Sequence, residues 1–570
     1  MRQPSEADLD PVVEDLRQAW GIDFDRAAAV VRALTAGPWH SIDDLVRAHG
    51  VSHRGVSALL RRLGPWLEHD QGRLRARPDA RAALRTAVGP ARAGLAPDPA
   101  SAAAAAEPEA LGAMTAIMAG RPEPSRHLDH VSATPLTAVK RARWLSASYQ
   151  LDRAAVLCLG DRDLTALALL LLQPGLDVTV LDVDERLLAY TGRVARERGW
   201  SLRPVFADLR VELPRSLADR FDLVFTDPPY TPAGIRLFLE RGLACLRQGD
   251  FGRLLFCYGF GEQHPALGLK VQAVLHDLRL VAEAVLPGFN RYLGAEAIGA
   301  ASALYVCRPT RRSRPAAASE GAAGLRIYTQ GRSAEEARPA ELPAAILATV
   351  RSALADAGPA PSTLVGDGFQ GLDDLPGPPP ARMQLGAFLS GLHAPAGGSS
   401  STGPVAVNLH PDLGPYLLRL LLVAPGPHLV LVAGDQAVRA SGLLDPDSGS
   451  TRLAGTAWRL RVLARRGGHP TVLAADRVEA PEEPVGQVLR YLLDHRLATL
   501  ESAWREGLIA TLARRGQRVT KNQARRAIHA NPLGRWHGPS YLPELPADAL
   551  AELPAAVART LAALGADPEA

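Results

Sequence analysis

At 570 residues the chain is too long for one hydrophobic core, so about three or four domains are expected. Hydrophobic residues make up 47% and charged residues 22%, which is typical of a soluble globular protein, and a net charge of +4 is too small to indicate nucleic-acid binding by itself. The sequence lacks an apolar run of the ~18 residues that span a bilayer, a secretory signal and paired CxxC cysteines, so we expect a cytoplasmic protein without membrane contact, disulfide framework or metal site.

Residues 1–86 predict a helical module that ends in a β-hairpin. Apolar residues recur at helical spacing in four segments, 9–20, 24–34, 42–49 and 56–63. Two short strands follow within residues 66–76, joined at Asp70-Gln71-Gly72. This order is typical of a winged helix. Such modules either bind DNA, here through Arg54, Arg61 and Arg62, or serve only in dimerisation and packing, and the sequence leaves both open.

An Ala- and Pro-rich stretch, 87–112, predicts a linker, and residues 113–310 then alternate between strands and helices. The predicted strands are short and apolar: 156–159, 178–181, 204–206, 223–225 and 254–257. The predicted helices between them are 164–172, 186–198 and 235–246. Continuous apolar strands alternating with helices indicate a mostly parallel, doubly wound sheet of the Rossmann-like α/β class.

Acidic residues follow four of these strands. They are Asp161 and Asp163 in Gly160-Asp161-Arg162-Asp163, then Asp182 with Asp184, then Asp208, then Asp227. Ligands of doubly wound folds bind at the carboxyl ends of the strands, so these acids should surround one crevice. Asp163 and Asp184 have a simpler explanation as helix N-caps.

The loop after the first strand carries Gly160 alone and lacks the G-x-G-x-x-G pattern of dinucleotide-binding folds. Aspartates in this loop would repel a pyrophosphate. A donor that carries positive charge and no phosphate, an adenosyl sulfonium, fits better. Asp182 is then expected to hold the ribose and Asp208 the adenine amino group.

The tetrapeptide Asp227-Pro228-Pro229-Tyr230 is the signature loop of amino-group methyltransferases, in which the acid and a proline carbonyl accept hydrogen bonds from the amine. It therefore indicates a nitrogen acceptor without identifying the amine. Methylation of bases in duplex DNA would also require base flipping and a basic binding face. Residues 113–310 show no concentrated basic strip, so nucleic acid is a possible partner but not the favoured one.

The motifs resemble those of the branched-chain polyamine synthases, that is, N4-bis(aminopropyl)spermidine synthases. The resemblance covers about residues 120–309 and includes the N-terminal module less specifically. Its motifs are Arg121-Pro122-Glu123-Pro124, His127-Leu128-Asp129, Thr134-Pro135, GDRDLTALAL, LDVDERL, FADLR, TDPPYT and Phe289-Asn290-Arg291-Tyr292. It implies a Rossmann-like methyltransferase fold, a homodimer, and transfer of an aminopropyl group from decarboxylated S-adenosylmethionine to an amine of a polyamine such as spermidine. No permanently bound cofactor is implied.

The resemblance also implies roles for individual residues. Asp163 matches the family's catalytic acid, and Asp161 and Asp227 would help to hold the polycation. Gly160, Asp182, Asp184 and Asp208 would contact the donor nucleoside. Tyr230, Asn290 and Tyr292 are expected on the acceptor side, and Glu123 and Asp129 would add negative charge.

Arg162 departs from the family, which has an aspartate at this position. The change replaces a negative charge by a positive one and should weaken attraction for a polyamine, unless Arg162 pairs with Asp161. A less cationic amine, or one bearing a carboxylate that Arg162 binds, is the resulting hypothesis.

After a predicted linker, 311–335, residues 336–570 predict a further α/β domain of unknown function. A helix is expected at 343–357, strands at 404–408 and 428–433, a helix or strand at 417–423, and a loop at 397–403. Two other functions remain open for the whole chain: an S-adenosylmethionine-dependent amino-group methyltransferase acting on nucleic acid or a small amine, and a winged-helix DNA-binding regulator that senses an adenosyl metabolite.

Overall fold

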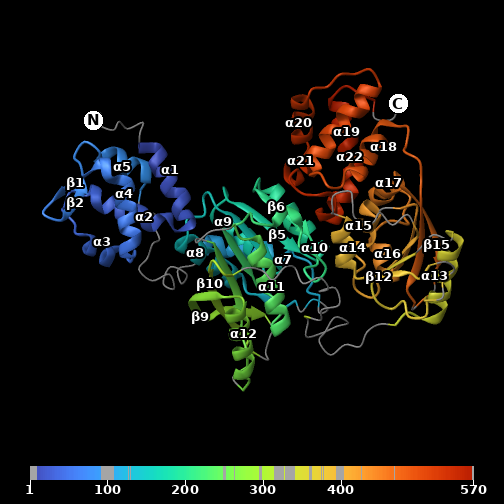
Figure 1. Ribbon diagram of the computed structural model, residues 1–570, viewed down its shortest axis with the longest axis horizontal. Coiled ribbons are helices and arrows are strands. Elements are labelled where there is room, and N and C mark those ends of the chain that lie inside the picture. Colours follow the sequence, from blue (N-terminus) through green and yellow to red (C-terminus); the bar gives the residue numbers. More distant parts are fainter. Residues whose placement is uncertain are drawn as a thin grey trace.

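The computed structural model is shown in Figure 1, coloured from the N-terminus in blue to the C-terminus in red. It describes residues 9–90, 108–125, 128, 130–247, 252–261, 263–293, 298–313, 327, 341–358, 362–373, 375, 378–392, 403–424, 426–465, 467 and 469–567. The ribbon has an N-terminal helical part, a central sheet with helices, and a C-terminal part on the opposite side of the central sheet from the N-terminal part.

The N-terminal module has the predicted helices and hairpin. Its elements are α1 (Leu9–Trp20), α2 (Phe24–Thr35), α3 (Ile42–His49), α4 (His53–Leu63), β1 (Leu67–Asp70), β2 (Arg73–Ala76) and α5 (Arg81–Val88). Ser41 caps α3 by accepting the Asp44 backbone N–H, and Asp44 returns the bond, so a capping box fixes the start of that helix. The assignment as a winged helix, and with it DNA binding, stays a prediction.

The central part is the predicted α/β fold. It is built from α7 (Pro108–Ala119), β3 (Ser132–Ala133), α8 (Pro135–Ser148), β4 (Ala155–Leu159), α9 (Thr165–Leu172), β5 (Asp177–Asp182), α10 (Glu185–Glu197), β6 (Leu202–Phe206), β7 (Leu223–Thr226), α11 (Pro232–Cys245), β8 (Arg253–Tyr258), α12 (Pro265–Asp277), β9 (Leu280–Leu293) and β10 (Ala301–Pro309). The strands from β4 to β8 are almost completely buried, as their continuous apolar sequences require. The predicted boundary between residues 112 and 113 falls inside α7, so the ordered fold begins earlier than expected.

The order of strands in the central sheet locates the crevice. The sheet has eight strands in the order β3-β9-β10-β8-β7-β4-β5-β6, and β4 to β8 run parallel. From β4 the chain proceeds outward to β5 and β6 on one side, and then to β7 and β8 on the other. The connections therefore diverge between β4 and β7, and ligands bind at such a switch point.

The C-terminal part contains a second sheet and a helical layer. Its elements are α13 (Ala344–Asp356), β11 (Thr363–Val365), β12 (Ala381–Met383), α14 (Leu385–Leu392), β13 (Val405–Asn408), α15 (Tyr416–Val423), β14 (His428–Ala433), α16 (Asp435–Ala440), α17 (Gly449–Gly455), β15 (Trp458–Ala464), β16 (Thr471–Arg477), α18 (Pro484–Asp494), α19 (Leu500–Arg514), α20 (Lys521–Ala530), α21 (Pro532–His537) and α22 (Ala547–Ala563). Six strands form one sheet in the order β12-β11-β13-β14-β16-β15. The segment expected as a helix or strand at 417–423 is the buried helix α15. Most of the expected loop 397–403 lies outside the described residues.

Ion pairs join the three parts. Arg253 on β8 binds Asp23 of the N-terminal module at 2.9 Å, and both side chains are buried. Arg419 on α15 binds Glu185 at the start of α10 at 2.7 Å. Within the described residues, no helix is both long and apolar enough to cross a bilayer.

Candidate functional site

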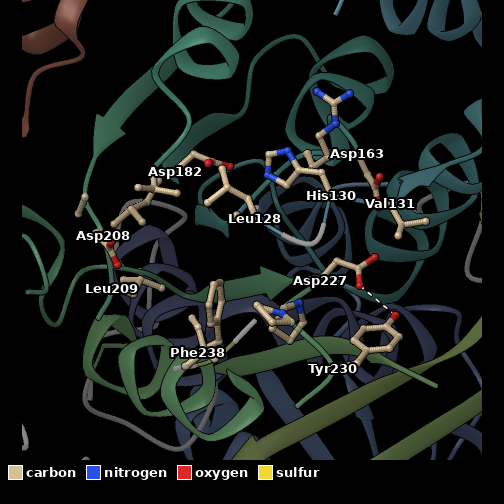
Figure 2. Close-up of a pocket in the computed structure, with 18 of the residues that line it drawn as sticks. Leu128, His130, Val131, Asp163, Asp182, Asp208, Leu209, Asp227, Tyr230 and Phe238 are labelled. Atoms are coloured by element: carbon tan, nitrogen blue, oxygen red, sulfur yellow. Dashed lines mark hydrogen bonds between the residues drawn. The ribbon is translucent and has the colours of Figure 1, made fainter. Parts of the chain in front are cut away.

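A pocket of about 310 Å³ opens at the carboxyl ends of β4, β5, β6 and β7, where the sequence predicts the crevice. Figure 2 shows Asp182 and Asp208 at one end of this pocket and Asp227 with Tyr230 at the other. Its lining includes Leu128, His130, Val131, Gly160, Arg162, Asp163, Leu181, Asp182, Ala207, Asp208, Leu209, Asp227, Pro228, Pro229, Tyr230, Phe238, Tyr292, Ile298 and Ile327. The acids that follow four separate strands therefore surround one cavity.

Asp161 has a structural position below the pocket. Its carboxylate accepts the backbone N–H groups of Thr165 at 2.8 Å and Ala166 at 2.9 Å, which are free donors at the start of α9. Burial raises the pKa of Asp161 to about 7. Asp161 is not among the described residues that line the pocket, and its carboxylate, rather than that of Asp163, binds the free N–H groups at the start of α9.

Asp163 lines the pocket and is held from two sides. One carboxylate oxygen accepts the backbone N–H of Ala133 at 2.7 Å, and the other accepts a guanidinium N–H of Arg141 at 2.9 Å. Arg141 projects from α8 and is completely buried. Although burial lowers the pKa of Arg141, surrounding groups including Asp227 and Asp163 outweigh it and raise that pKa above its usual value.

Asp227 is the centre of a hydrogen-bond network at the other end of the pocket. It accepts from Arg141 at 2.6 Å, from the Tyr292 hydroxyl at 2.8 Å and from the Tyr230 hydroxyl at 3.0 Å. The two tyrosine oxygens lie 2.9 Å apart. Burial raises the pKa of Asp227 to about 6, against the opposing effect of the Arg141 charge. A carboxylate with a pKa near 6 is well suited to accept a proton at neutral pH.

Asp182 and Asp208 are at the far end. Asp182 accepts the backbone N–H groups of Asp161 at 3.1 Å and Asp184 at 2.8 Å, and burial raises its pKa to about 7. Asp208 binds Arg210 through both carboxylate oxygens, with a shortest distance of 2.6 Å. Apolar groups, Leu209 and Phe238 among them, line the same end. This combination suits a flat heterocycle with a polar sugar.

Arg162 does not pair with Asp161 as one hypothesis suggested. It is 7% exposed, and its Nε and one terminal nitrogen are buried without a hydrogen-bond partner in the described part of the chain. Burial, followed by the nearby charge of Arg121, lowers its pKa. Beside it His130 lines the pocket, and burial lowers the pKa of His130 to about 4, so this imidazole is neutral at physiological pH.

Other predicted site residues lie outside the pocket. Asp184 caps α10 and pairs with Arg186 at 2.7 Å, so its N-cap explanation is the better one. Asn290 is buried behind the pocket and accepts from Arg141 at 2.8 Å. Glu123 is exposed, and only its backbone carbonyl contacts Arg186, at 3.4 Å. Asp129 and His127 lie outside the described residues.

The sequence did not single out Arg141, His130, Phe238 or Ile327 as site residues. Arg141 is one cation among several on a helix, and nothing in the periodicity of α8 marks it as buried. Ile327 belongs to the predicted linker 311–335, yet it lines the pocket and its carbonyl accepts from Thr231 at 2.8 Å. In the described residues we find no group of three or more His, Cys, Asp and Glu side chains that would hold a metal ion.

Comparison with known proteins gives matches to part of the chain. The N(4)-bis(aminopropyl)spermidine synthase of Thermococcus kodakarensis is 34% identical over 190 residues, which are 32% of this chain and 53% of that protein. The enzyme of the same name from Methanocaldococcus jannaschii is 30% identical over 181 residues, 31% of this chain and 51% of that protein. The chain thus spans about half the length of these relatives.

A solved structure of a branched-chain polyamine synthase mutein from Thermus thermophilus, in complex with N4-aminopropylspermidine and 5'-methylthioadenosine, is 23% identical. It covers 58% of this chain and 99% of that chain with a TM-score of 0.34. A family model, the branched-chain polyamine synthase A C-terminal domain, matches residues 109–336. The resemblance predicted from the motifs is therefore confirmed for this segment, which is similar to the branched-chain polyamine synthases.

Proposed function

We propose that the chain transfers an aminopropyl group from an adenosyl sulfonium, decarboxylated S-adenosylmethionine, to an amine nitrogen of a polyamine. The observation that carries the proposal is that Asp163 and Asp227, both bound to Arg141, line one pocket together with Asp182 and Asp208. The match of residues 109–336 to the family model supports the same reaction.

The reaction is a displacement at carbon. The lone pair of the amine nitrogen attacks the carbon bound to the sulfonium, the carbon–sulfur bond breaks, and its electron pair stays on sulfur, which leaves as the neutral thioether 5'-methylthioadenosine. The attacking nitrogen must lose a proton. Asp227 is the proposed proton acceptor because its carboxylate, with a pKa of about 6, is ionised at neutral pH and lines the pocket.

Tyr230 and Tyr292 are proposed to orient that carboxylate. Each hydroxyl donates a hydrogen bond to Asp227. Burial keeps the pKa of both phenols well above the usual value, so they stay protonated and remain donors. Arg141 balances the charges of Asp163 and Asp227 and keeps the pKa of Asp227 lower than burial alone would allow. Asp161, Asp184 and Asn290 then act by supporting the loops rather than by touching a reactant.

The donor nucleoside is proposed to lie between Phe238, Asp182 and Asp208. A carboxylate at the end of the second parallel strand suits ribose hydroxyls. Arg162 is proposed to affect which amine acts as the acceptor. Its guanidinium adds a positive charge where the family has an acid, which favours an acceptor amine with fewer charges than spermidine. A homodimer, implied by the resemblance, stays a prediction.

Product analysis tests the function. The chain is incubated with decarboxylated S-adenosylmethionine, or with S-adenosylmethionine, and a panel of amines that includes spermidine and amines bearing a carboxylate. Mass spectrometry should detect an aminopropyl adduct together with 5'-methylthioadenosine. The matched control is Asp227→Asn, which keeps the shape of the side chain and removes the proton acceptor.

Two results would contradict the proposal in different ways. A methyl group on the acceptor would identify an amino-group methyltransferase. Calorimetric binding of the donor without product from any amine would favour the regulator that senses an adenosyl metabolite.

A further inference from the structure

The two sheets of the molecule have the same strand order. The central sheet contains the series β5-β4-β7-β8-β10-β9, and the C-terminal sheet has β12-β11-β13-β14-β16-β15. The first four strands of each series are parallel, and the last two form an antiparallel pair. The order along the chain agrees as well. β4, β5, β7, β8, β9 and β10 take the same places in the first series as β11, β12, β13, β14, β15 and β16 take in the second. Among the described residues, the C-terminal sheet has no counterparts of β6 and β3.

The register of the strands gives residue-by-residue equivalence. In the central sheet Leu159 pairs with Leu181 and Thr226. In the C-terminal sheet Val365 pairs with Met383 and Val407. We therefore treat Leu159 and Val365 as equivalent, together with their partners on the neighbouring strands. The residues that directly follow these positions can then be compared between the two sheets.

The first compared pair is Gly160 and Gly366. Both have positive φ, +65° and +89°. The N–H of Gly160 donates to Leu181 at 2.8 Å, and the N–H of Gly366 donates to the equivalent Met383 at 2.9 Å. The turn after the first strand is therefore the same in both sheets, down to its hydrogen bond.

Two acids that line the proposed catalytic pocket are replaced at the equivalent strand ends of the second sheet. Asp182 corresponds to Gln384, and Asp227 corresponds to Asn408. The Gln384 amide donates to Asp367 at 3.0 Å. At these two strand ends the second sheet therefore has amides where the first sheet has the carboxylates proposed to bind a ribose and an amine.

The loop after β13, which corresponds to the Asp227 loop, and the start of α15 instead contact the catalytic half. The Tyr416 hydroxyl accepts the backbone N–H of Asp208 at 3.2 Å, and its ring lies 5.5 Å from that of Phe206 at the end of β6. Asp412 binds Arg210 at 2.8 Å, and Arg210 holds the Asp208 carboxylate. Tyr416 is 2% exposed.

We propose that the C-terminal domain is a second copy of the catalytic fold that has lost its own adenosyl site and now positions the Asp208 loop of the first copy. Tyr416 is the positioning residue. It contacts the end of the edge strand β6, whose equivalent is missing from the described part of the second copy, and fixes the backbone at the nucleoside end of the pocket. The identity of the nucleoside rests on the proposed function; the duplication does not.

Binding stoichiometry tests the loss of the second site. Calorimetry of the full chain with 5'-methylthioadenosine should give one molecule per chain. Binding should disappear in Asp182→Asn and remain in the equivalent change Gln384→Ala, with circular dichroism confirming that both variants are folded. Two molecules per chain, or a site that depends on Gln384, would overturn the inference.

The same titration separates this inference from the proposed function. One bound nucleoside without transfer to any amine would remove the proposed reaction and leave the inference intact. Complete absence of nucleoside binding would overturn both the proposed function and the positioning role of Tyr416, because there would be no adenosyl site to position.

Kinetics test the role of Tyr416. Tyr416→Phe removes one hydrogen bond to the Asp208 backbone, and we expect the donor KM and the 5'-methylthioadenosine Kd to rise about two- to tenfold with little change in kcat. Tyr491→Phe on α18 is the matched control and should change neither constant. If Tyr416→Phe and Asp412→Asn both leave donor binding unchanged, Tyr416 does not position the site.

Discussion

Arg141 donates a hydrogen bond to Asp227 at 2.6 Å, although the two residues are 86 positions apart in the chain. A second nitrogen of the same guanidinium binds Asp163 at 2.9 Å. The guanidinium is completely buried, so these interactions are not screened by water. The positive charge therefore permits two acids to coexist in the wall of the pocket.

Replacing Arg141 by methionine should strongly destabilise the protein. The change leaves two buried carboxylates without their counter-charge, and breaking such a buried pair typically costs about 3–5 kcal/mol. Urea unfolding measures the loss. Arg141→Lys, which keeps the positive charge, should lose less stability. The double variant Arg141→Met/Asp227→Asn should lose less stability than the two single variants together. Additive losses would show that the two residues do not interact.

The rate of transfer should depend on the ionisation of Asp227. Burial raises the pKa of this carboxyl to about 6, so below that pH it is protonated and unable to accept the proton of the amine. We expect kcat/KM to rise with pH through about 6. The acceptor amine itself titrates much higher, near ~10, so the two effects are separable. In Asp227→Asn the rise of kcat/KM near pH 6 should be absent. If the rise persists in this variant, another group is responsible for it.

Much of the site follows from the sequence because parallel strands bring their carboxyl ends together. Gly160, Asp182, Asp208 and Asp227 each follow an apolar strand, and the structure gathers all of them at one pocket. Their separation along the chain does not matter, since the sheet order determines their proximity.

The sequence did not predict that Arg141 neutralises the buried acids of the pocket. Arg141 is on a helix whose polar and apolar residues give no clear buried face, and its burial depends on tertiary packing against Phe225 on β7 and Asn290 on β9. The repeat of the strand order was also hidden. Of the strand-end residues compared, only the glycine after the first strand is retained, and a register can be compared only once the strands are paired.

Arg162→Asp should improve the use of spermidine. The change removes a buried cation from the wall of the pocket and supplies the acid found in the family, so a polycation is attracted rather than repelled. We expect the KM for spermidine to fall by about tenfold. Arg193→Asp, the same charge change at an exposed position on α10, is the control. An unchanged KM in Arg162→Asp would show that Arg162 does not determine the acceptor.

Protein stability should fall as the pH rises toward 7, because of Asp161. Burial raises the pKa of this carboxyl from its usual 3.8 to about 7 in the folded state. Between these values the folded protein binds more protons than the unfolded chain, so the free energy of unfolding decreases with increasing pH. The contribution is fully present below about pH 4 and is lost as the pH rises through about 7.

Urea unfolding at several pH values measures this dependence. Asp161→Asn cannot ionise, so its stability should fall less steeply with pH, even though the amide satisfies only one of the two backbone N–H groups at the start of α9. Asp177→Asn, at an exposed position on β5, should keep the slope of the original chain. If Asp161→Asn also keeps that slope, the buried carboxyl is not the group that titrates, and Asp182, whose pKa burial raises to about 7 as well, becomes the next to replace.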